Sequence, residues 1–268
     1  MQDAVPPLRL HRPPMDPSNP TLGQRLLISL ATYNERDNLA PLVAAIHEKL
    51  TAADVLITDD NSPDGTGRLA DDLAANDRRV HVLHRAGKLG LGTAVLAAMR
   101  FAMDGNYDLF LNLDADFSHP PRYLPDLVAG MCDHDVMIGS RYVPGGGTQD
   151  WPWSRKFISR SVNLFVRLAL RMPVRDASGA YRCYRVDLLR RVRLDRVRSR
   201  GYSFQQEVLF RCHQAGARIG ETPIIFENRK AGTSKVSLKE SVRSISMLGW
   251  LGVRATLGLE RHSERTAA

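Results

Sequence analysis

The chain has 268 residues, of which 43% are hydrophobic and 25% charged, the balance of a soluble globular protein with room for one large α/β domain or two small ones. Its formal net charge of +8 favours anionic partners, such as phosphates, an anionic membrane surface or nucleic acid. Three cysteines without C-x-x-C spacing indicate neither a disulfide framework nor a zinc site, and point to a reducing cytoplasm.

Residues 1–22 are rich in proline and polar residues, and we expect them to form a disordered leader. They lack the apolar core of a signal peptide. No stretch of the sequence approaches the roughly 18 uninterrupted apolar residues that a membrane-spanning helix needs. The sequence therefore predicts no membrane span.

Short apolar runs alternate with amphipathic segments through the first part of the chain. Strands are expected at residues 25–30, 55–58, 80–83, 109–114 and 135–139. Helices are expected between them, at residues 39–50, 66–75 and 121–131, and one that opens in the stretch 84–93 and runs to about 103. This alternation is typical of a mainly parallel sheet covered by helices, with the turns after strands gathered on one rim.

Two polar turns follow the first two expected strands. The first runs from Ala31 to Asn38, where Asp37 or Asn38 is expected to cap the next helix. The second, residues 59–66, is strongly acidic. After the third strand comes a glycine-rich loop around Lys88 that matches neither common phosphate-binding motif. Lys88 is thus either a nucleotide contact or a solvated lysine in a glycine-softened turn.

The fourth expected strand runs directly into Asp114 and Asp116. Two ionised carboxylates buried without partners would cost several kcal/mol, so they are better placed at the carboxyl end of the strand, at the mouth of the sheet. There they suit one Mg²⁺ or Mn²⁺ ion shared with a diphosphate. An isolated Asp-x-Asp is more often a pair of solvated loop residues, and it is the strand before it that favours a metal site.

The second half of the chain has a different character. A glycine-rich loop, residues 143–148, precedes an expected helix over residues 161–171 with a wide apolar face and basic margins. This helix fits a membrane interface and a core-facing position equally well. A helix over residues 204–215, a strand over 218–225, a basic loop over 227–235 and a last amphipathic helix over 238–257 follow.

Five of these stretches, in this order, resemble the family-2 glycosyltransferases of GT-A fold, and specifically the dolichol- or polyprenol-phosphate mannosyltransferases. They are Thr32–Glu35, Asp59–Thr66, Gly87–Gly92, Asp114–Asp116 with His119 and Pro120, and Gly139–Tyr142. The likeness continues through Trp151–Trp153 and Asp176–Arg182 to Ser234 and Lys235, and covers roughly residues 25–255.

The resemblance implies a GT-A domain over residues 23–258, with an acceptor-side loop and interfacial helix at about 143–171 and a tail at 259–268. It implies inverting transfer of mannose from GDP-mannose to a polyprenyl phosphate. It also implies a protein at the inner face of the cell membrane, bound peripherally or through a membrane-anchoring partner protein, because many relatives carry transmembrane helices that this sequence lacks.

The resemblance assigns roles to individual residues. Asp114, Asp116 and Ser118 match the metal site, and Asp116 and Arg141 are the expected catalytic residues. The acceptor phosphate is expected at Arg141, Arg155 and Ser159. Residues expected to bind the nucleotide sugar are Thr32, Tyr33, Glu35, Asp60, Asp64, Lys88, Asp114, Arg229 and Lys235.

Other functions remain as alternatives. A UDP-glucose-dependent polyprenyl-phosphate glucosyltransferase on the same fold is the nearest. A lipid-carrier scaffold would bind the sugar nucleotide without turnover. The high positive charge suits a nucleic-acid-binding module, but the acidic rim and the absence of a recognition motif argue against one. A nicotinamide dehydrogenase would need a glycine fingerprint that the first turn lacks.

Overall fold

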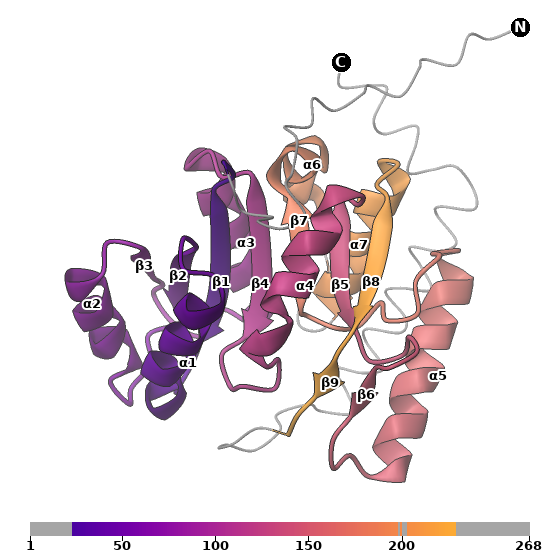
Figure 1. The fold of residues 1–268 in the computed structure, drawn as a ribbon, viewed down its shortest axis with the longest axis horizontal. Helices are drawn as coiled ribbons and strands as arrows, with labels where there is room; N and C mark the ends of the chain where they lie inside the picture. Colours follow the sequence, from indigo (N-terminus) through magenta and orange to yellow (C-terminus); the bar gives the residue numbers. More distant parts are fainter. Residues whose placement is uncertain (1–22, 198, 200–202, 229–268) are drawn as a thin grey trace, which may run out of the picture.

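A computed structural model describes residues 23–197, 199 and 203–228. Its centre is a seven-stranded sheet in the order β3-β2-β1-β4-β7-β5-β8, beside a small sheet of β6 and β9 (Figure 1). The strands are β1 (Leu26–Thr32), β2 (Asp54–Asp59), β3 (Val80–His84), β4 (Leu109–Asp114), β5 (Val136–Ser140), β6 (Gly147–Thr148), β7 (Arg182–Arg185), β8 (Ile219–Pro223) and β9 (Ile225–Phe226). The expected α/β class with a mainly parallel sheet is confirmed.

Helices cover both faces of the large sheet (Figure 1). They are α1 (Arg36–Lys49), α2 (Thr66–Asn76), α3 (Leu91–Asp104), α4 (Leu124–Ala129), α5 (Trp153–Ala169), α6 (Val186–Arg191) and α7 (Ser203–Gln214). Side chains of a strand alternate between the two faces, so each strand feeds two separate cores. Leu27 of β1 packs on the side of α3, α6 and α7, whereas Ile28 packs on the side of α1, α2 and α4.

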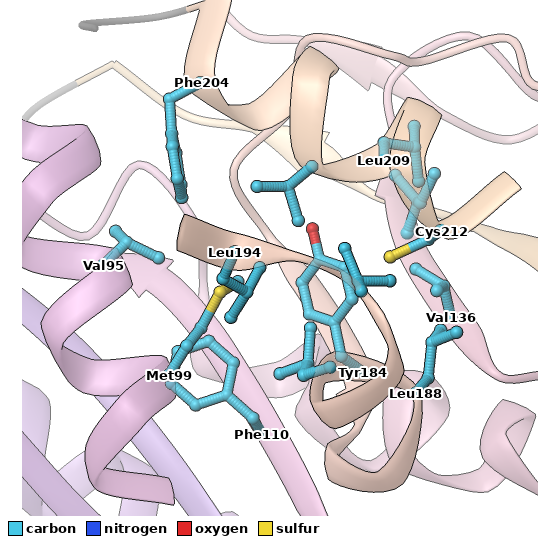
Figure 2. Close-up of a cluster of buried hydrophobic side chains, with 14 of the residues drawn as sticks. Val95, Met99, Phe110, Val136, Tyr184, Leu188, Leu194, Phe204, Leu209 and Cys212 are labelled. Atoms are coloured by element: carbon cyan, nitrogen blue, oxygen red, sulfur yellow. The ribbon is translucent and has the colours of Figure 1, made fainter. Parts of the chain in front are cut away.

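The core on the α3 and α7 side joins distant parts of the chain. Figure 2 shows Met99 of α3 and Phe110 of β4 close to Tyr184 of β7, with Phe204 and Leu209 of α7 around them. All five side chains are at most 3% exposed, and the rings of Phe110 and Tyr184 lie 6.4 Å apart. This packing holds α7 against strands β4 and β7.

Strand β7 breaks the parallel pattern and was not expected as a strand. It lies antiparallel between β4 and β5, pairing Leu111 with Cys183 and Met137 with Cys183 on its two edges. Because β7 runs in the opposite direction, its start lies at the rim where β4 and β5 end. The loop before β7 is thereby placed next to the loops that follow those two strands.

Several predicted boundaries differ from the structure. Helix α1 begins at Arg36 with Glu35 at its N-cap and no side-chain cap, so the expected caps Asp37 and Asn38 are wrong. The side-chain amide of Asn38 instead donates from Nδ2 to Glu35 Oε2 at 2.8 Å. The expected helix 121–131 is split into two 3₁₀ turns around the short α4. Helix α5 begins eight residues before the expected position, at Trp153 rather than Ser161.

The expected leader (1–22), the last helix (238–257) and the tail (259–268) lie outside the described residues. Within the described residues, no helix has both the length and the apolar character needed to cross a bilayer.

Candidate active site

The loops after β1 and β2 are tied together at the rim of the sheet. Thr32 Oγ1 donates to Asp59 Oδ1 at 3.1 Å, and the amide of Asp60 donates to the carbonyl of Thr32 at 3.1 Å. Asp59 also accepts bonds from the amide and hydroxyl of Ser62. The parallel pairing of Thr32 with Asp59 brings the two loops to the same rim. The expected nucleotide residues Thr32 and Asp60 therefore lie side by side.

Asp60 is a buried carboxylate held by a cation from the next loop. Its Oδ1 lies 2.8 Å from Arg85 Nη1, and both side chains are less than a tenth exposed. The amide of Leu89 donates to Asp60 Oδ2 at 3.2 Å. Burial raises the pKa of Asp60, and the charge of Arg85 opposes that rise. Asp60 thus fixes the glycine-rich loop that carries Lys88.

Lys88 lies over the first turn. Its exposed side chain places Nζ 4.3 Å from the ring centre of Tyr33, a cation–π contact that joins the β1–α1 and β3–α3 loops. The amide of Glu35 donates to Thr66 Oγ1 at 3.0 Å. Tyr33, Glu35 and Lys88, all expected at the nucleotide, are therefore in one neighbourhood. The exposed ammonium of Lys88 is accessible to a phosphate.

Asp64 has its carboxylate engaged within its own loops. Oδ1 accepts from the amide and hydroxyl of Thr66 at 3.0 and 2.6 Å, and Oδ2 accepts from the amide of Arg36 at 3.3 Å. Burial raises the pKa of Asp64, but these hydrogen bonds outweigh burial and the pKa is lowered overall. In this structure Asp64 shapes the start of α2, where the N-cap is Gly65 in the left-handed conformation.

The loop after β4 carries the acidic pair in a constrained backbone. Phe117 has a φ of 63°, a left-handed conformation that is uncommon for a bulky residue. Asp116 is 3% exposed and accepts a bond from the amide of Ser118 at 3.0 Å, whereas the side chain of Asp114 is 29% exposed. Such strain is typical of functional loops, where the surrounding structure imposes the conformation.

His119 supports the loop that follows β4. The amide of Asp114 donates to His119 Nδ1 at 3.1 Å, so this nitrogen carries no proton. Burial lowers the pKa of His119, and the carboxylates of Asp114 and Asp116 oppose that effect. The ring is 2% exposed and lies 5.0 Å from that of Tyr181 and 5.2 Å from that of Phe226. A neutral, packed imidazole thus holds the backbone of the acidic pair.

The donor set in this loop fits a hard divalent cation. Asp114 and Asp116 supply carboxylates, and the fully buried hydroxyl of Ser118 has no hydrogen-bond partner among the described residues. A buried polar atom without a partner is costly and calls for a ligand. No cluster of three or more His, Cys, Asp or Glu ligands occurs within the described ranges. Oxygen ligands this few suit a metal that substrate phosphates help to coordinate.

Arg141, at the end of β5, forms a buried ion pair with Asp176. Its Nε and Nη2 donate to the two carboxylate oxygens of Asp176, each at 2.7 Å, and its amide donates to Oδ2 at 3.1 Å. Burial alone would raise the pKa of Asp176, but Arg141 holds it at about 2. The amide of Asp176 donates to Glu221 at 2.9 Å. Arg141 is therefore rigidly positioned by the loop before β7.

The other two residues expected at the acceptor lie on α5. Tyr142 OH donates to Ser159 Oγ at 2.6 Å, so Ser159 is tied to the residue after Arg141. The guanidinium of Arg155 lies 3.9 Å from the ring centre of Trp151. That ring is 5.4 Å from Phe226 and 5.6 Å from the guanidinium of Arg141. The structure thus brings Arg141, Arg155 and Ser159 into one region.

An aromatic cluster joins the acidic loop to this basic region. Phe226 contacts His119 on one side and Trp151 on the other, and the guanidinium of Arg141 lies 5.7 Å from its ring centre. The predicted metal ligands and the predicted acceptor residues therefore border the same site. Arg229 and Lys235, also expected at the diphosphate, lie outside the described residues.

Three residues of the site escaped sequence reasoning as functional positions: Arg85, His119 and Asp176. Arg85 stands close to the glycine-rich loop, and His119 follows the acidic pair, so their places in the sequence were a usable signal. Asp176 begins one of the stretches that carry the family resemblance, but its pairing with Arg141, 35 residues away, leaves no pattern in the sequence.

Comparisons with known proteins identify the family. Residues 28–193 match the profile described as "Glycosyl transferase family 2". An undecaprenyl-phosphate mannosyltransferase of Micrococcus luteus is 43% identical over 242 residues, which cover 88% of this chain and all of that protein. A polyprenol monophosphomannose synthase of Mycolicibacterium smegmatis is 39% identical, covering 92% of this chain and 94% of its own length.

Solved structures share the fold. Glucosyl-3-phosphoglycerate synthase from Mycobacterium tuberculosis, in complex with Mn²⁺, UDP-glucose and phosphoglyceric acid, superimposes with a TM-score of 0.61 at 15% identity. The match covers 93% of this chain and 86% of that one. The likeness at this low identity concerns the fold. With the profile match and the two relatives, the chain is a member of glycosyltransferase family 2, with the GT-A fold.

Proposed function

We propose that the protein transfers mannose from GDP-mannose to a polyprenyl phosphate, with inversion at the anomeric carbon. The observation that carries the proposal is the arrangement of the rim: Phe226 contacts His119, which holds the backbone of Asp114, and also lies beside the guanidinium of Arg141. This chain covers most of the length of its two relatives, and their names supply the substrate class.

The donor is assigned to the loops after β1, β2 and β3. Thr32, Tyr33, Glu35 and Asp60 would surround the nucleoside, and Lys88 would contact a phosphate. Asp64 would act by shaping the turn, since its carboxylate is already engaged. Arg229 and Lys235 would contact the diphosphate, as the family resemblance implies.

A divalent cation, Mg²⁺ or Mn²⁺, would be held by Asp114, Asp116 and Ser118. When bound, it supplies positive charge against the diphosphate that leaves the sugar. The chain's own residues prepare this place: His119 holds the backbone of Asp114, and the amide of Ser118 orients Asp116. Cations on the neighbouring loops add to the stabilisation of the developing negative charge.

The acceptor phosphate is assigned to Arg141, Arg155 and Ser159. A phosphate monoester has a second pKa near 6, so it is largely ionised at neutral pH and needs no general base. What it needs is orientation and loss of water. Arg141 is rigid because Asp176 holds it. Trp151 and Phe226 provide apolar surface beside its guanidinium. We further propose that the protein works at the inner face of the cell membrane, peripherally or with an anchoring partner.

A donor-resolved assay tests the proposal. Purified protein, Mn²⁺ and a short-chain polyprenyl phosphate are incubated with GDP-mannose or UDP-glucose, and the lipid products are separated by mass. Polyprenyl-phosphate mannose with a β-anomeric linkage supports the proposal. Polyprenyl-phosphate glucose would establish the glucosyltransferase alternative, and nucleotide binding without either product would establish a carrier role.

A further inference from the structure

A pocket beside the proposed acceptor site contains three arginines to which the transfer reaction assigns no role. It lies between α5 and the loop after β5 and has a volume of about 570 Å³. Its lining includes Arg160 and Arg167 of α5 and Arg175 of the following loop, with Arg141 among its other lining residues. No Asp or Glu lines it. The pocket therefore has the charge of an anion site.

The three outer arginines are available to a ligand. The side chains of Arg160, Arg167 and Arg175 are exposed, and none forms an ion pair with a carboxylate among the described residues. The fourth, Arg141, is committed to Asp176. Residues 151–175 contain six basic residues and no acidic one. Guanidinium groups bind phosphate through paired, planar hydrogen bonds, so a phosphate is the anion that this pocket suits best.

The pocket opens beside an exposed apolar face of α5. Its lining includes Leu164, which is 54% exposed. Trp153, Phe157 and Leu168 of the same helix are 78%, 59% and 67% exposed, and the rings of Trp153 and Phe157 stack at 5.6 Å. Figure 1 shows α5 at the edge of the molecule, away from the central sheet. Aromatic and aliphatic side chains flanked by arginines are typical of helices in a bilayer interface.

The pocket lies on a different strip of α5 from the proposed acceptor residues. At about 100° per residue, Arg160 and Arg167 fall roughly 80–140° around the helix from Arg155 and Ser159. Ser159 faces Tyr142, whose hydroxyl donates to it. The two sets of basic residues thus lie on different strips of the helix, while Arg141 and Tyr142, which holds Ser159, line the pocket as well.

We propose that this pocket binds the phosphodiester of an anionic phospholipid of the bilayer, while the apolar face of α5 inserts at the interface. A polar network then links the docked helix to the site: Asn163 Nδ2 donates to Ser178 Oγ at 2.9 Å, and Arg141 Nη2 donates to the same oxygen at 2.8 Å. The inference rests on the proposed function in that a lipid acceptor is presented at a bilayer. Vesicle binding without donor or acceptor tests it separately.

The experiment measures binding of the full chain to vesicles of phosphatidylcholine, with and without phosphatidylglycerol. The triple variant R160Q/R167Q/R175Q removes the pocket charges. The matched control R68Q/R78Q/R100Q removes three exposed arginines from other helices and loops. Loss of three cations near an anionic surface predicts binding to phosphatidylglycerol vesicles weaker by on the order of 10- to 100-fold in the pocket variant. The control should lose less than about threefold, and binding to pure phosphatidylcholine should not differ between the variants.

The same variants are assayed for transfer to a detergent-solubilised short-chain polyprenyl phosphate. An unchanged KM for this acceptor supports a site for bilayer phospholipid. A raised KM would assign the pocket to the acceptor and overturn the inference. Equal losses of vesicle binding in both triple variants would also overturn it, because only the net charge would then matter. So would a shift from dimer to monomer in the pocket variant on gel filtration with light scattering, since a second copy would be the occupant. If no sugar is transferred by any form but the vesicle result holds, the proposed function fails and this inference stands.

Discussion

The guanidinium of Arg141 and the carboxylate of Asp176 form two parallel hydrogen bonds of 2.7 Å in a region where Asp176 is completely buried. This geometry locks a catalytic candidate at the end of β5 to the loop that precedes β7. The carboxylate has a pKa of about 2, below its ordinary value, because the attraction of Arg141 outweighs the effect of burial. The pair is therefore ionised throughout the neutral range.

Replacing Asp176 with Asn should destabilise the fold and lower activity together. The substitution leaves the buried guanidinium of Arg141 without its countercharge, which typically costs about 3–5 kcal/mol. The free energy of unfolding from urea titration measures the loss. Asp133→Asn, at an exposed aspartate, should change it by less than about 0.5 kcal/mol. An unfolding energy for Asp176→Asn equal to that of the control would show that the ion pair contributes little.

The same pair predicts a pH dependence. The pKa of Asp176 is lower in the folded protein than in the unfolded chain, so its contribution is complete above about pH 4 and is lost as the pH falls towards 2. Wild-type stability should decline across this interval more steeply than that of Asp176→Asn. Parallel curves for the two proteins would contradict the assignment.

Asp116→Ala should lower turnover by on the order of a hundredfold or more, because it removes a main electrostatic support of the leaving diphosphate. Steady-state turnover with GDP-mannose, Mn²⁺ and a short polyprenyl phosphate measures the effect. Asp126→Ala, at an exposed position on α4, is the matched control and should keep near-normal turnover. Near-normal turnover in Asp116→Ala would remove the carboxylate from the reaction.

The order of polar turns along the sequence predicted the rim of the sheet, because strands followed by helices must place those turns together. It did not predict β7, whose four residues include two arginines. Arginine is ordinarily a surface residue. Arg182, however, is fully buried and donates to the carbonyls of Ala177 and Gln205. A buried cation that donates to backbone carbonyls leaves no periodic pattern in the sequence.

The side-chain contacts that hold the site residues in place could not be predicted from the sequence either. Asp60 was identified as a nucleotide residue, but its pairing with Arg85 depends on the register of β2 and β3. Asp64 is predicted to bind the nucleotide sugar, and its carboxylate accepts hydrogen bonds from Thr66 and Arg36. Motif order locates the functional loops, whereas the hydrogen bonds that fix each side chain depend on tertiary packing.

Ser118→Ala tests the unpartnered hydroxyl in the acidic loop. Removing a buried polar atom that has no described partner should leave the unfolding energy unchanged or slightly raised. If the hydroxyl contributes to the metal site, the Mn²⁺ concentration giving half-maximal activity should rise several-fold. An unchanged metal requirement would leave Asp114 and Asp116 as the side-chain ligands of this loop. Ser62→Ala, which removes a hydroxyl that contacts Asp59, is the comparison and should leave the metal requirement unaltered.

His119→Gln should flatten the dependence of stability on pH near neutrality. The folded protein keeps His119 neutral because burial lowers its pKa, whereas the unfolded chain takes up a proton near the ordinary value of 6.5. The unfolded state therefore binds more protons as the pH falls, and His119 alone should lower wild-type stability below about pH 6.5 by at most about 1.4 kcal/mol per pH unit. Glutamine offers an acceptor to the amide of Asp114 and does not titrate. Unfolding energies of the wild type and of His119→Gln at pH 7.5 and 5.5 measure the difference. A wild-type slope in His119→Gln would mean that another group takes up the proton.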